Sequence, residues 1–313
     1  MYDLIILGGG PAGLTAAIYA LRKRLNALVI TPDLGGKTNY RLQLPNVEHH
    51  LVINGEEIVN RFANELEYLD FARVMDKARS VEAIPGGYRV RTRDGASYDA
   101  RALIVATGAN AQRLNVPGEK EYMMRGVCYS AVSYAPLFVE RDVVVVGDAG
   151  RALNAAAELA QIARQVTLVA PAHGELDGPL GKRLRARANV AVVENQRVTS
   201  VVGDEYARTL VLTRPNGLTT DLHADAFFVE LGLTPNSELV KGLAALDAQG
   251  RIEVDARNRT SAPGLFAAGD VTDAYAEQVL IAIGEGAKAA LSACEYLLEH
   301  PAAEKELARE EWR

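Results

Sequence analysis

The chain has 313 residues, enough for two domains of about 150 residues each. Apolar residues make up 49% of it and charged residues 24%, which excludes a disordered or fibrous chain. The formal net charge of −6 gives no general attraction to nucleic acid or to anionic lipid, and two cysteines, Cys128 and Cys294, are too few for a disulfide scaffold or a four-thiolate metal site.

The first elements form a strand–helix–strand unit. Residues 2–7 are a continuous apolar run, typical of a buried parallel strand, and residues 27–30 form the next strand. Between them, residues 14–24 have the alanine content and the apolar spacing of a helix. Such a unit implies a parallel sheet with a right-handed crossover.

Residues 4–21 carry no charge, but Gly8-Gly9-Gly10-Pro11 interrupts this stretch. A basic segment of the kind that opens a signal peptide does not precede it. We therefore expect no membrane span and a cytoplasmic protein.

The remaining elements follow from the same patterns, with turn signals at Pro85-Gly86-Gly87 and Asp94-Gly95. In chain order we expect a helix at 58–69, strands at 79–84, 88–92, 97–98, 102–105 and 143–146, a turn at 147–150, a helix at 152–163, strands at 166–169 and 265–270, and a helix after Val279.

Two strand–turn–helix starts, at Gly8 and at Gly147, predict two doubly wound units. Asn115-Val116-Pro117-Gly118 marks the crossing into the second unit, and the stretch 242–250 marks the return. We therefore expect an α/β fold of two Rossmann-like domains, in which the second domain (115–245) is inserted into the first (1–114 and 246–313).

The turn after the first strand fits the pattern G-x-G-x-x-G, with Gly8, Gly10 and Gly13 in the glycine positions and Pro11-Ala12 between the last two. The first glycine permits a tight turn, the second lets a pyrophosphate approach the backbone, and the third allows close packing of helix and strand. The N-terminus of the following helix supplies N–H donors and a positive dipole end. This loop predicts dinucleotide binding.

The acid that usually contacts the adenosine ribose is missing from the end of the second strand, where Thr31-Pro32-Asp33 stands. Thr31 or Asp33 is the candidate for that contact. The missing acid weakens the case for NAD at this site and leaves FAD open.

Three further segments carry motifs: Ala106-Thr107-Gly108-Ala109, Gly264-Leu265-Phe266-Ala267-Ala268-Gly269-Asp270 and Glu277-Gln278-Val279. Together with the glycine-rich loop they resemble the low-molecular-weight thioredoxin reductase family of FAD proteins. The resemblance covers nearly the whole chain and includes Gly35-Gly36, Asn46, Arg125-Gly126-Val127 and Pro235-Asn236.

The resemblance implies a homodimer with non-covalent FAD in the first domain. Asp270 would accept hydrogen bonds from the ribityl hydroxyls, and the helix that starts near Val279 would stabilise the reduced flavin. The residues implied to contact FAD are Gly8, Gly10, Pro11, Ala12, Gly13, Thr31, Asp33, Gly36, Lys37, Asn46, Ala106, Thr107, Gly108, Gly269, Asp270, Gln278 and Val279.

The sequence departs from the family where its dithiol would be. Counted from Arg125-Gly126-Val127, the two family cysteines fall on Ser130 and Ser133, and the family's proton-donating acid falls on Tyr134. Dithiol exchange needs a thiolate and a second thiol, and a serine hydroxyl can serve as neither. Cys128 is expected to be a small buried residue, with a direct thiol–flavin role as the alternative, and Cys294 is expected in the core. The catalytic residues stay unassigned.

The second nucleotide loop also departs from the family. Gly147 is kept, but Ala149 places a methyl group where a pyrophosphate would approach, and Asp148 adds a negative charge. The stretch 169–174 contains neither Arg nor Lys, although the family binds the 2′-phosphate of NADPH there. The sequence therefore predicts no NADPH recognition of the family's kind, and it leaves NADH, a second nucleotide or a second flavin open.

Other polar features have two interpretations each. His173 is a proton donor, a phosphate contact or a solvated loop residue. The basic run Lys182, Arg183, Arg185 and Arg187 on an expected helix would dock a small acidic protein such as a ferredoxin or flavodoxin, or is a solvated face. The aromatic rings of Tyr129 and Tyr134 stack on a ligand or line a surface between domains.

Three functions remain open. The first is an FAD-dependent oxidoreductase that exchanges electrons with a ferredoxin-like protein, a second flavin or nucleotide, or a small acceptor. The second is an NAD(P)H-dependent flavin or ferredoxin reductase. The third is a non-catalytic FAD-binding sensor or assembly protein.

Overall fold

The computed structural model describes residues 1–40, 42–43, 56–67, 69 and 72–301, which fold into two compact units. Unit 1 gathers the described residues of 1–39, 55–109 and 235–313, and unit 2 gathers those of 40–54 and 110–234. The chain thus enters unit 2 after Ala109 and returns at Pro235. The crossings expected from the sequence, at 115–118 and 242–250, lie a few residues further along the chain.

Unit 1 contains a sheet with three helices of eight or more residues. The strands are β1 (Tyr2–Leu7), β2 (Ala27–Ile30), β3 (Arg73–Val74), β4 (Ala78–Ile84), β5 (Gly87–Thr92), β6 (Ser97–Val105) and β17 (Leu265–Ala267). The helices are α1 (Pro11–Arg22), α2 (Glu56–Glu67) and α6 (Val279–Glu299), with short 3₁₀ turns at Gly36–Asn39 and Glu238–Val240.

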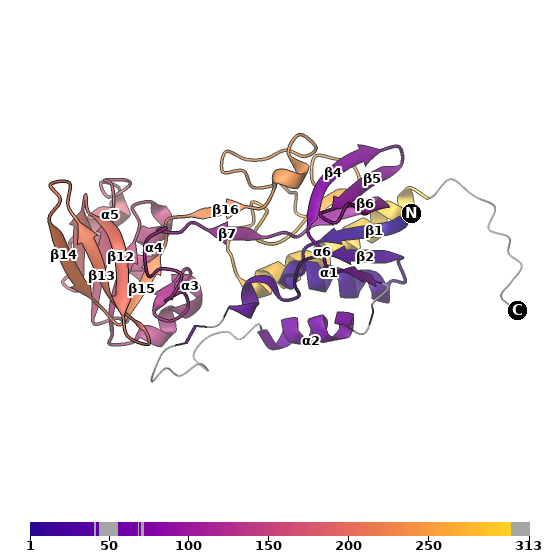
Figure 1. The fold of residues 1–313 in the computed structure, drawn as a ribbon. Helices are drawn as coiled ribbons and strands as arrows, with labels where there is room; N and C mark the ends of the chain where they lie inside the picture. Colours follow the sequence, from indigo (N-terminus) through magenta and orange to yellow (C-terminus); the bar gives the residue numbers. More distant parts are fainter. Residues whose placement is uncertain (41, 44–55, 68, 70–71, 302–313) are drawn as a thin grey trace, which may run out of the picture. The chain divides into compact units, whose positions relative to one another are not determined.

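The sheet of unit 1 has the order β3-β2-β1-β6-β5-β4, with β17 also paired to β6 (Figure 1). Strands β3, β2, β1, β6 and β17 are parallel, with Leu4 opposite Ala27 and Ala102, whereas β4 and β5 pair antiparallel. Strand β6 serves both parts, since its first half pairs with β5 and its second half with β17.

Alternate residues of β1 point to opposite faces of this sheet, as a pleated strand requires. Leu4 and Ile6 pack in one buried cluster with α1, α2 and α6, while Ile5 and Leu7 pack in another that includes Val240 and Ile252. Both faces are covered, which explains why the strand is apolar throughout instead of alternating.

Unit 2 contains two further sheets. Its strands are β8 (Val127–Cys128), β9 (Asp142–Val146), β10 (Gln165–Ala170), β11 (Val190–Glu194), β12 (Arg197–Gly203), β13 (Ala207–Thr213), β14 (Thr219–His223) and β15 (Ala226–Val229). Its helices are α3 (Ala131–Tyr134), a 3₁₀ turn (Ala135–Phe138), α4 (Gly150–Leu159) and α5 (Pro179–Arg185). One sheet is parallel, in the order β11-β10-β9-β15-β8, and β12-β13-β14 form an antiparallel one. Strands β7 (Ala109–Ala111) and β16 (Leu233–Pro235) pair where the chain passes between units.

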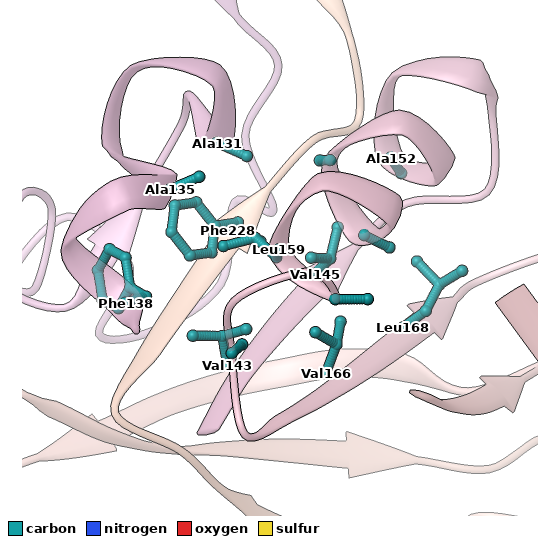
Figure 2. Close-up of a cluster of buried hydrophobic side chains, with 14 of the residues drawn as sticks. Ala131, Ala135, Phe138, Val143, Val145, Ala152, Leu159, Val166, Leu168 and Phe228 are labelled. Atoms are coloured by element: carbon teal, nitrogen blue, oxygen red, sulfur yellow. The ribbon is translucent and has the colours of Figure 1, made fainter. Parts of the chain in front are cut away.

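One of the two buried clusters of unit 2 lies between the parallel sheet and its helices, and the other lies between that sheet and β12–β13. Figure 2 shows Val143, Val145, Val166 and Leu168 of β9 and β10 among side chains of α3 and α4. The rings of Phe138 and Phe228 meet edge to face, with centroids 5.1 Å apart and an interplanar angle of 81°. Burial of each such aromatic side chain stabilises the fold by about 1.5–3 kcal/mol. This cluster therefore holds α3 and the following 3₁₀ turn in place.

The two strand–helix–strand cycles are confirmed, and three expected elements need correction. Segments 97–98 and 102–105 are one strand, β6. The helix expected to reach residue 163 ends at Leu159, and the carbonyl of Ala160 accepts hydrogen bonds from Arg187 and Asn189 instead. The strand expected to reach residue 270 ends at Ala267, because Gly269 has a φ of +77°. None of the described helices is long and apolar enough to cross a membrane.

Candidate functional site

Three glycines of the first loop are required by packing, among them Gly9, where a Cβ would lie 2.1 Å from the carbonyl oxygen of Asp33. Gly8 has a φ of +113°, and a Cβ there would lie 2.2 Å from the carbonyl oxygen of Ala106. A Cβ on Gly13 would lie 1.9 Å from the carbonyl oxygen of Gly8. The loop therefore closes tightly between β1 and α1, as expected from the sequence.

Gly10 has a different role, since no heavy atom lies within 4 Å of where its Cβ would stand. It is the N-cap of α1 and has no side-chain cap; Pro11 and Ala12 open the helix. An open glycine at the end of a helix whose N–H groups need acceptors is a suitable place for a phosphate. The loop fits the pyrophosphate of a dinucleotide.

The segment after β2 lies against this loop. The Gly35 N–H donates to the carbonyl oxygen of Gly9 at 2.7 Å, and a Cβ on Gly36 would lie 3.0 Å from Gly10 Cα. Thr31 is buried and its hydroxyl donates to the Asp33 carbonyl oxygen at 2.7 Å. The Asp33 carboxylate is exposed and accepts the Gly36 N–H at 3.0 Å. Of the two candidates for a ribose contact, Asp33 is the accessible one.

Lys37 and Asp270, which are distant in sequence, form an ion pair in unit 1. Lys37 Nζ lies 2.8 Å from Asp270 Oδ2 and 3.9 Å from a carboxylate oxygen of Glu277. Asp270 is the less exposed of the pair, with 17% of its side chain accessible. The carboxylate that the family resemblance assigns to the ribityl chain is therefore already paired with a cation.

The segment 106–108 is fixed by Asn236. The Thr107 hydroxyl donates to the Asn236 carbonyl oxygen at 2.8 Å, and the Asn236 side-chain amide donates back to Thr107 O at 2.9 Å. Gly108 accepts the Asn236 N–H and has a φ of +66°. Ala106 N–H donates to Leu7 O, which joins this segment to the first strand.

The C-terminal motif lies beside the N-terminus of α1. A Cβ on Gly269 would lie 3.1 Å from the Cβ of Ala12, and the Gly269 N–H donates to the Glu285 carboxylate at 2.9 Å. Gly286 of α6 lies against the backbone of Ala12, where a Cβ would be only 2.1 Å from its carbonyl oxygen. Helices α1 and α6 therefore pack side by side (Figure 1). Glu285 and Gly286 were not predicted from the sequence, although an acid and a glycine within an apolar helix were a signal for both.

Gln278 is the N-cap of α6, and Val279 is its first residue. The Gln278 Nε2 atom is buried and finds no hydrogen-bond partner among the described residues. A buried amide without a partner costs free energy, so this atom fits a position that a bound ligand would satisfy. Asn46, the remaining residue implied for FAD, lies outside the described residues.

In unit 2, the two serines in the dithiol positions contact each other. The Ser130 hydroxyl donates to Ser133 Oγ at 2.9 Å. Tyr134 is half-buried against the core, and its burial, with a further contribution from nearby Cys128, raises the pKa of its hydroxyl. Cys128 is fully buried on β8; this burial, with the negative charge of Glu230, raises the pKa of its thiol. Cys294 is half-buried on α6.

A buried acid that the sequence analysis missed holds the serine turn. Glu230 follows β15, and 1% of its side chain is exposed. It accepts the Ala131 N–H at 2.7 Å and pairs with the Arg151 guanidinium, which in turn donates to the Tyr129 carbonyl oxygen. The sequence signal for Glu230 was the position of an acidic residue directly after an apolar strand.

Tyr129 contacts a second buried acid. Its hydroxyl donates to Glu119 at 2.9 Å, and Glu119 also accepts the N–H groups of Leu114 and Asn115. Burial and the Glu119 carboxylate raise the pKa of Tyr129. The Tyr129 hydroxyl thus holds the chain near the entry to unit 2.

The second nucleotide loop keeps the glycine that its turn requires, but the residues after that glycine differ from the family pattern. A Cβ on Gly147 would lie 2.7 Å from the carbonyl oxygen of Glu230, so glycine is required there. Ala149 is exposed and caps α4. The Asp148 carboxylate accepts the Ala172 N–H at 3.0 Å and so ties this loop to the segment after β10.

His173, on that segment, lies between two carboxylates. Its Nε2 is 2.8 Å from Asp177 and its Nδ1 is 2.9 Å from Glu194, and both acids raise the pKa of the imidazole. Arg185 pairs with the same two acids, at 3.6 and 2.5 Å. His173 is therefore an exposed loop residue that takes part in an ion-pair network.

The basic run on α5 is partly engaged within the chain. Besides Arg185, Arg187 donates to the Ala160 carbonyl oxygen, while Lys182 and Arg183 are exposed. All four residues are exposed, so the run still presents positive charge to solvent, although two of its cations have partners within the chain. Among the described residues, no group of three or more His, Cys, Asp or Glu is placed to hold a metal ion.

Comparisons with known proteins agree with the motifs. The family model described as pyridine nucleotide-disulphide oxidoreductase matches residues 2–286. The F component of alkyl hydroperoxide reductase in Staphylococcus aureus is 35% identical over 305 residues, which cover 96% of this chain and 60% of the relative. The F component of the Pseudomonas putida alkyl hydroperoxide reductase is 37% identical over 305 residues, which cover 95% of this chain and 58% of the relative. The chain thus spans about three fifths of the length of these relatives.

Solved structures show the same likeness. Thioredoxin reductase from Streptococcus pyogenes is 33% identical with a TM-score of 0.85, covering 96% of this chain and 99% of that one. Thioredoxin reductase from Giardia duodenalis is 30% identical with a TM-score of 0.85, covering 95% and 99%. The family and the fold expected from the sequence are confirmed: the chain belongs to the pyridine nucleotide-disulphide oxidoreductase family and has the two-domain Rossmann-type fold of thioredoxin reductase.

Proposed function

We propose that this chain is an FAD-dependent oxidoreductase that does not work by dithiol–disulfide exchange. The observation that carries the proposal is the 2.9 Å hydrogen bond between Ser130 Oγ and Ser133 Oγ, at the positions of the family dithiol. A hydroxyl pair can neither attack a disulfide nor store two electrons as a bond between the two side chains. Electrons must therefore enter and leave by another route.

The fit of unit 1 to FAD supports the first half of this proposal. Gly10 leaves space for the pyrophosphate at the N-terminus of α1, and Gln278 Nε2 is a buried donor without a described partner. The exposed Asp33 carboxylate would accept from the ribose hydroxyls, and Asp270, which pairs with Lys37, would accept from the ribityl hydroxyls. Bound FAD would supply the capacity to take up and release electrons; these residues would bind and orient it.

Unit 2 supports a donor other than NADPH. The family would place the 2′-phosphate near the segment that holds His173, and here Asp177 and Glu194 accompany that residue. Arg185 is already paired with both of these carboxylates, the segment 169–174 supplies no Arg or Lys of its own, and Ala149 places a methyl group at the approach to the loop. We infer that the electron partner is a ferredoxin-like or flavodoxin-like protein, a second flavin or nucleotide, or a small acceptor.

The proposal is tested by anaerobic titration of the FAD-loaded protein. We expect reduced ferredoxin to bleach the flavin rapidly, NADPH to bleach it slowly or not at all, and thioredoxin disulfide to remain oxidised. Rapid NADPH-driven reduction of thioredoxin would refute the proposal. A chain that takes up no FAD would refute it as well.

A second candidate is an NADH-dependent flavin or ferredoxin reductase. It is favoured by Gly147, which the packing against Glu230 preserves, and by the N-terminus of α4, where Ala149 makes no side-chain cap hydrogen bond. NADH carries no 2′-phosphate, so the carboxylates around His173 do not exclude it. Rapid bleaching by NADH in the same titration would favour this candidate over the first.

The family resemblance also supports a homodimer. Sedimentation of the purified protein tests this directly, and a single species with the mass of one chain would contradict it.

A further inference from the structure

A cation stands between two carboxylates at one end of unit 1. Lys37 Nζ is 2.8 Å from Asp270 and 3.9 Å from Glu277, and these residues come from three separate segments of the chain. The pair is sheltered on the acid's side, since 17% of the Asp270 side chain is exposed. The position of this ion pair depends on how firmly the backbone is held on the lysine side and on the acid's side.

The backbone on the lysine side is tied to the glycine-rich loop. The Gly35 N–H donates to Gly9 O at 2.7 Å, and the Gly36 backbone lies against Gly10. The backbone on the acid's side is tied to α1 and α6, because Gly269 packs on Ala12 and donates to Glu285. Lys37 therefore lies at the same end of the unit as the phosphate cradle and the N-terminus of α6.

Charge at this end of unit 1 would act on bound FAD. Reduction by two electrons with uptake of one proton leaves the flavin with one additional negative charge. Asp270 and Glu277 together oppose that charge, while Lys37 and the N-terminus of α6 favour it. Because Asp270 is partly desolvated, the interaction energy between its charge and a neighbouring charge is larger than it would be in bulk water.

We propose that Lys37 sets the reduction potential of the FAD in unit 1, by offsetting the two carboxylates and raising the potential. The inference rests on the proposed function, namely that unit 1 holds FAD. Lys37 acts here as a positively charged neighbour and takes no part in proton or electron transfer.

A purely structural role for Lys37 makes a different prediction. If the ion pair only fastened the 36–39 turn to Asp270, its loss would weaken FAD binding and lower stability without a directed change in potential. The potential therefore separates the two roles.

The experiment measures the potential of the FAD-loaded protein against a reference dye during slow anaerobic reduction. The variants are Lys37→Met, Lys37→Arg and Glu277→Gln. Lys241→Met is the matched control, because Lys241 is an exposed lysine of the same unit that pairs with Glu238 at 3.8 Å.

We expect Lys37→Met to lower the ratio of reduced to oxidised flavin at a fixed potential by at least tenfold, which for a two-electron couple is about 30 mV. Lys37→Arg keeps the charge and should stay within about threefold of the parent, or about 14 mV. Glu277→Gln should shift the ratio in the opposite direction. Lys241→Met should leave it unchanged.

An unchanged potential in Lys37→Met would overturn the inference while FAD binding, and with it the proposed function, stood. If Lys37→Met does not bind FAD, the test rests on Glu277→Gln. A reduction potential of Glu277→Gln that equals or lies below that of the parent would then overturn the inference. A parent protein that takes up no FAD would refute the proposed function and this inference together.

Discussion

The carboxylate of Glu230 accepts a 2.7 Å hydrogen bond from the backbone N–H of Ala131, the residue after Ser130. The same carboxylate pairs with Arg151 on α4. One buried acid therefore connects the end of β15 with the serine turn and with the second nucleotide loop. The Arg151 guanidinium compensates the charge of this buried acid.

Arg151→Met should accordingly destabilise unit 2. The substitution removes the cation that pairs with a buried carboxylate, and we expect a loss of about 2–3 kcal/mol, since Arg151 is partly exposed. Hydrogen exchange followed by mass spectrometry of peptides from α3 and α4 measures this locally.

Arg164→Met is the control for this prediction. Arg164 pairs with Asp142 at 2.7 Å, but 66% of its side chain is exposed, so its loss should cost less than about 1 kcal/mol. Adding Glu230→Gln to Arg151→Met should recover part of the loss. Equal losses in Arg151→Met and Arg164→Met would contradict the assigned role of the buried pair.

The glycines of the first loop should respond in two distinct ways. Gly13→Ala places a methyl group 1.9 Å from a carbonyl oxygen and should destabilise the apoprotein by about 3 kcal/mol or more. Gly10→Ala has open space and a φ of −76°, so the apoprotein should melt as the parent does. Its FAD affinity should nevertheless fall by about tenfold or more, because the methyl group occupies the phosphate approach.

Thermal melting of the apoprotein and quenching of FAD fluorescence measure these two effects separately. Gly284→Ala, at an exposed position inside α6, is the matched substitution and should stabilise the protein by about 0.5–1 kcal/mol. Unaltered FAD affinity in Gly10→Ala would show that the phosphate lies elsewhere.

Cys128 should be inert in the folded protein. It is fully buried, and its thiol pKa is raised, so iodoacetamide should label Cys128 only after denaturation. The half-buried Cys294 serves as the internal comparison and should react first. Mass spectrometry of the labelled peptides gives the order, and rapid labelling of native Cys128 would revive the interpretation of a thiol that acts on the flavin.

His173 should make unit 2 pH-dependent. Because Asp177 and Glu194 raise its pKa, protonated His173 is favoured in the folded chain. Its contribution to stability is complete below the unfolded pKa, about 6.5, and is lost as the pH rises through the higher folded value. The melting temperature of His173→Gln should therefore lie below that of the parent at acid pH and approach it at alkaline pH.

His223→Gln is the control, since His223 is an exposed histidine bonded to the Thr209 hydroxyl. Its melting temperature should follow that of the parent across the same pH range. A constant difference between His173→Gln and the parent at all pH values would exclude the ion pairs as the cause.

The sequence was sufficient for the parts of the fold that depend on neighbours in the chain. Strand β1 and the turn at Gly8 were predicted because burial on both faces and the tight loop leave local signatures. The hairpins β12–β14 were not predicted, since their strands mix apolar and polar residues and lack a continuous apolar run. Ser130 and Ser133 were assigned to the dithiol positions by counting from Arg125-Gly126-Val127. They contact each other because they are only three residues apart.

Contacts between distant segments could not be predicted in the same way. Lys37 and Asp270 are 233 residues apart, and nothing near either residue indicates the other. Glu230 looks like any acid after a strand until β8, α3 and α4 are packed around it. The ion-pair network of His173 was likewise hidden, because Glu194 reaches this residue from another strand.

The packing of Gly286 against Ala12 has a consequence for how the protein is made. Unit 1 is built from an early and a late part of the chain. The packing of α6 beside the glycine-rich loop can therefore form only after the ribosome has synthesised α6. Residues 110–234, by contrast, emerge as one continuous stretch and can fold earlier. During translation one apolar face of the nascent N-terminal strands is therefore covered only in part, by α1 and α2, until α6 has been made.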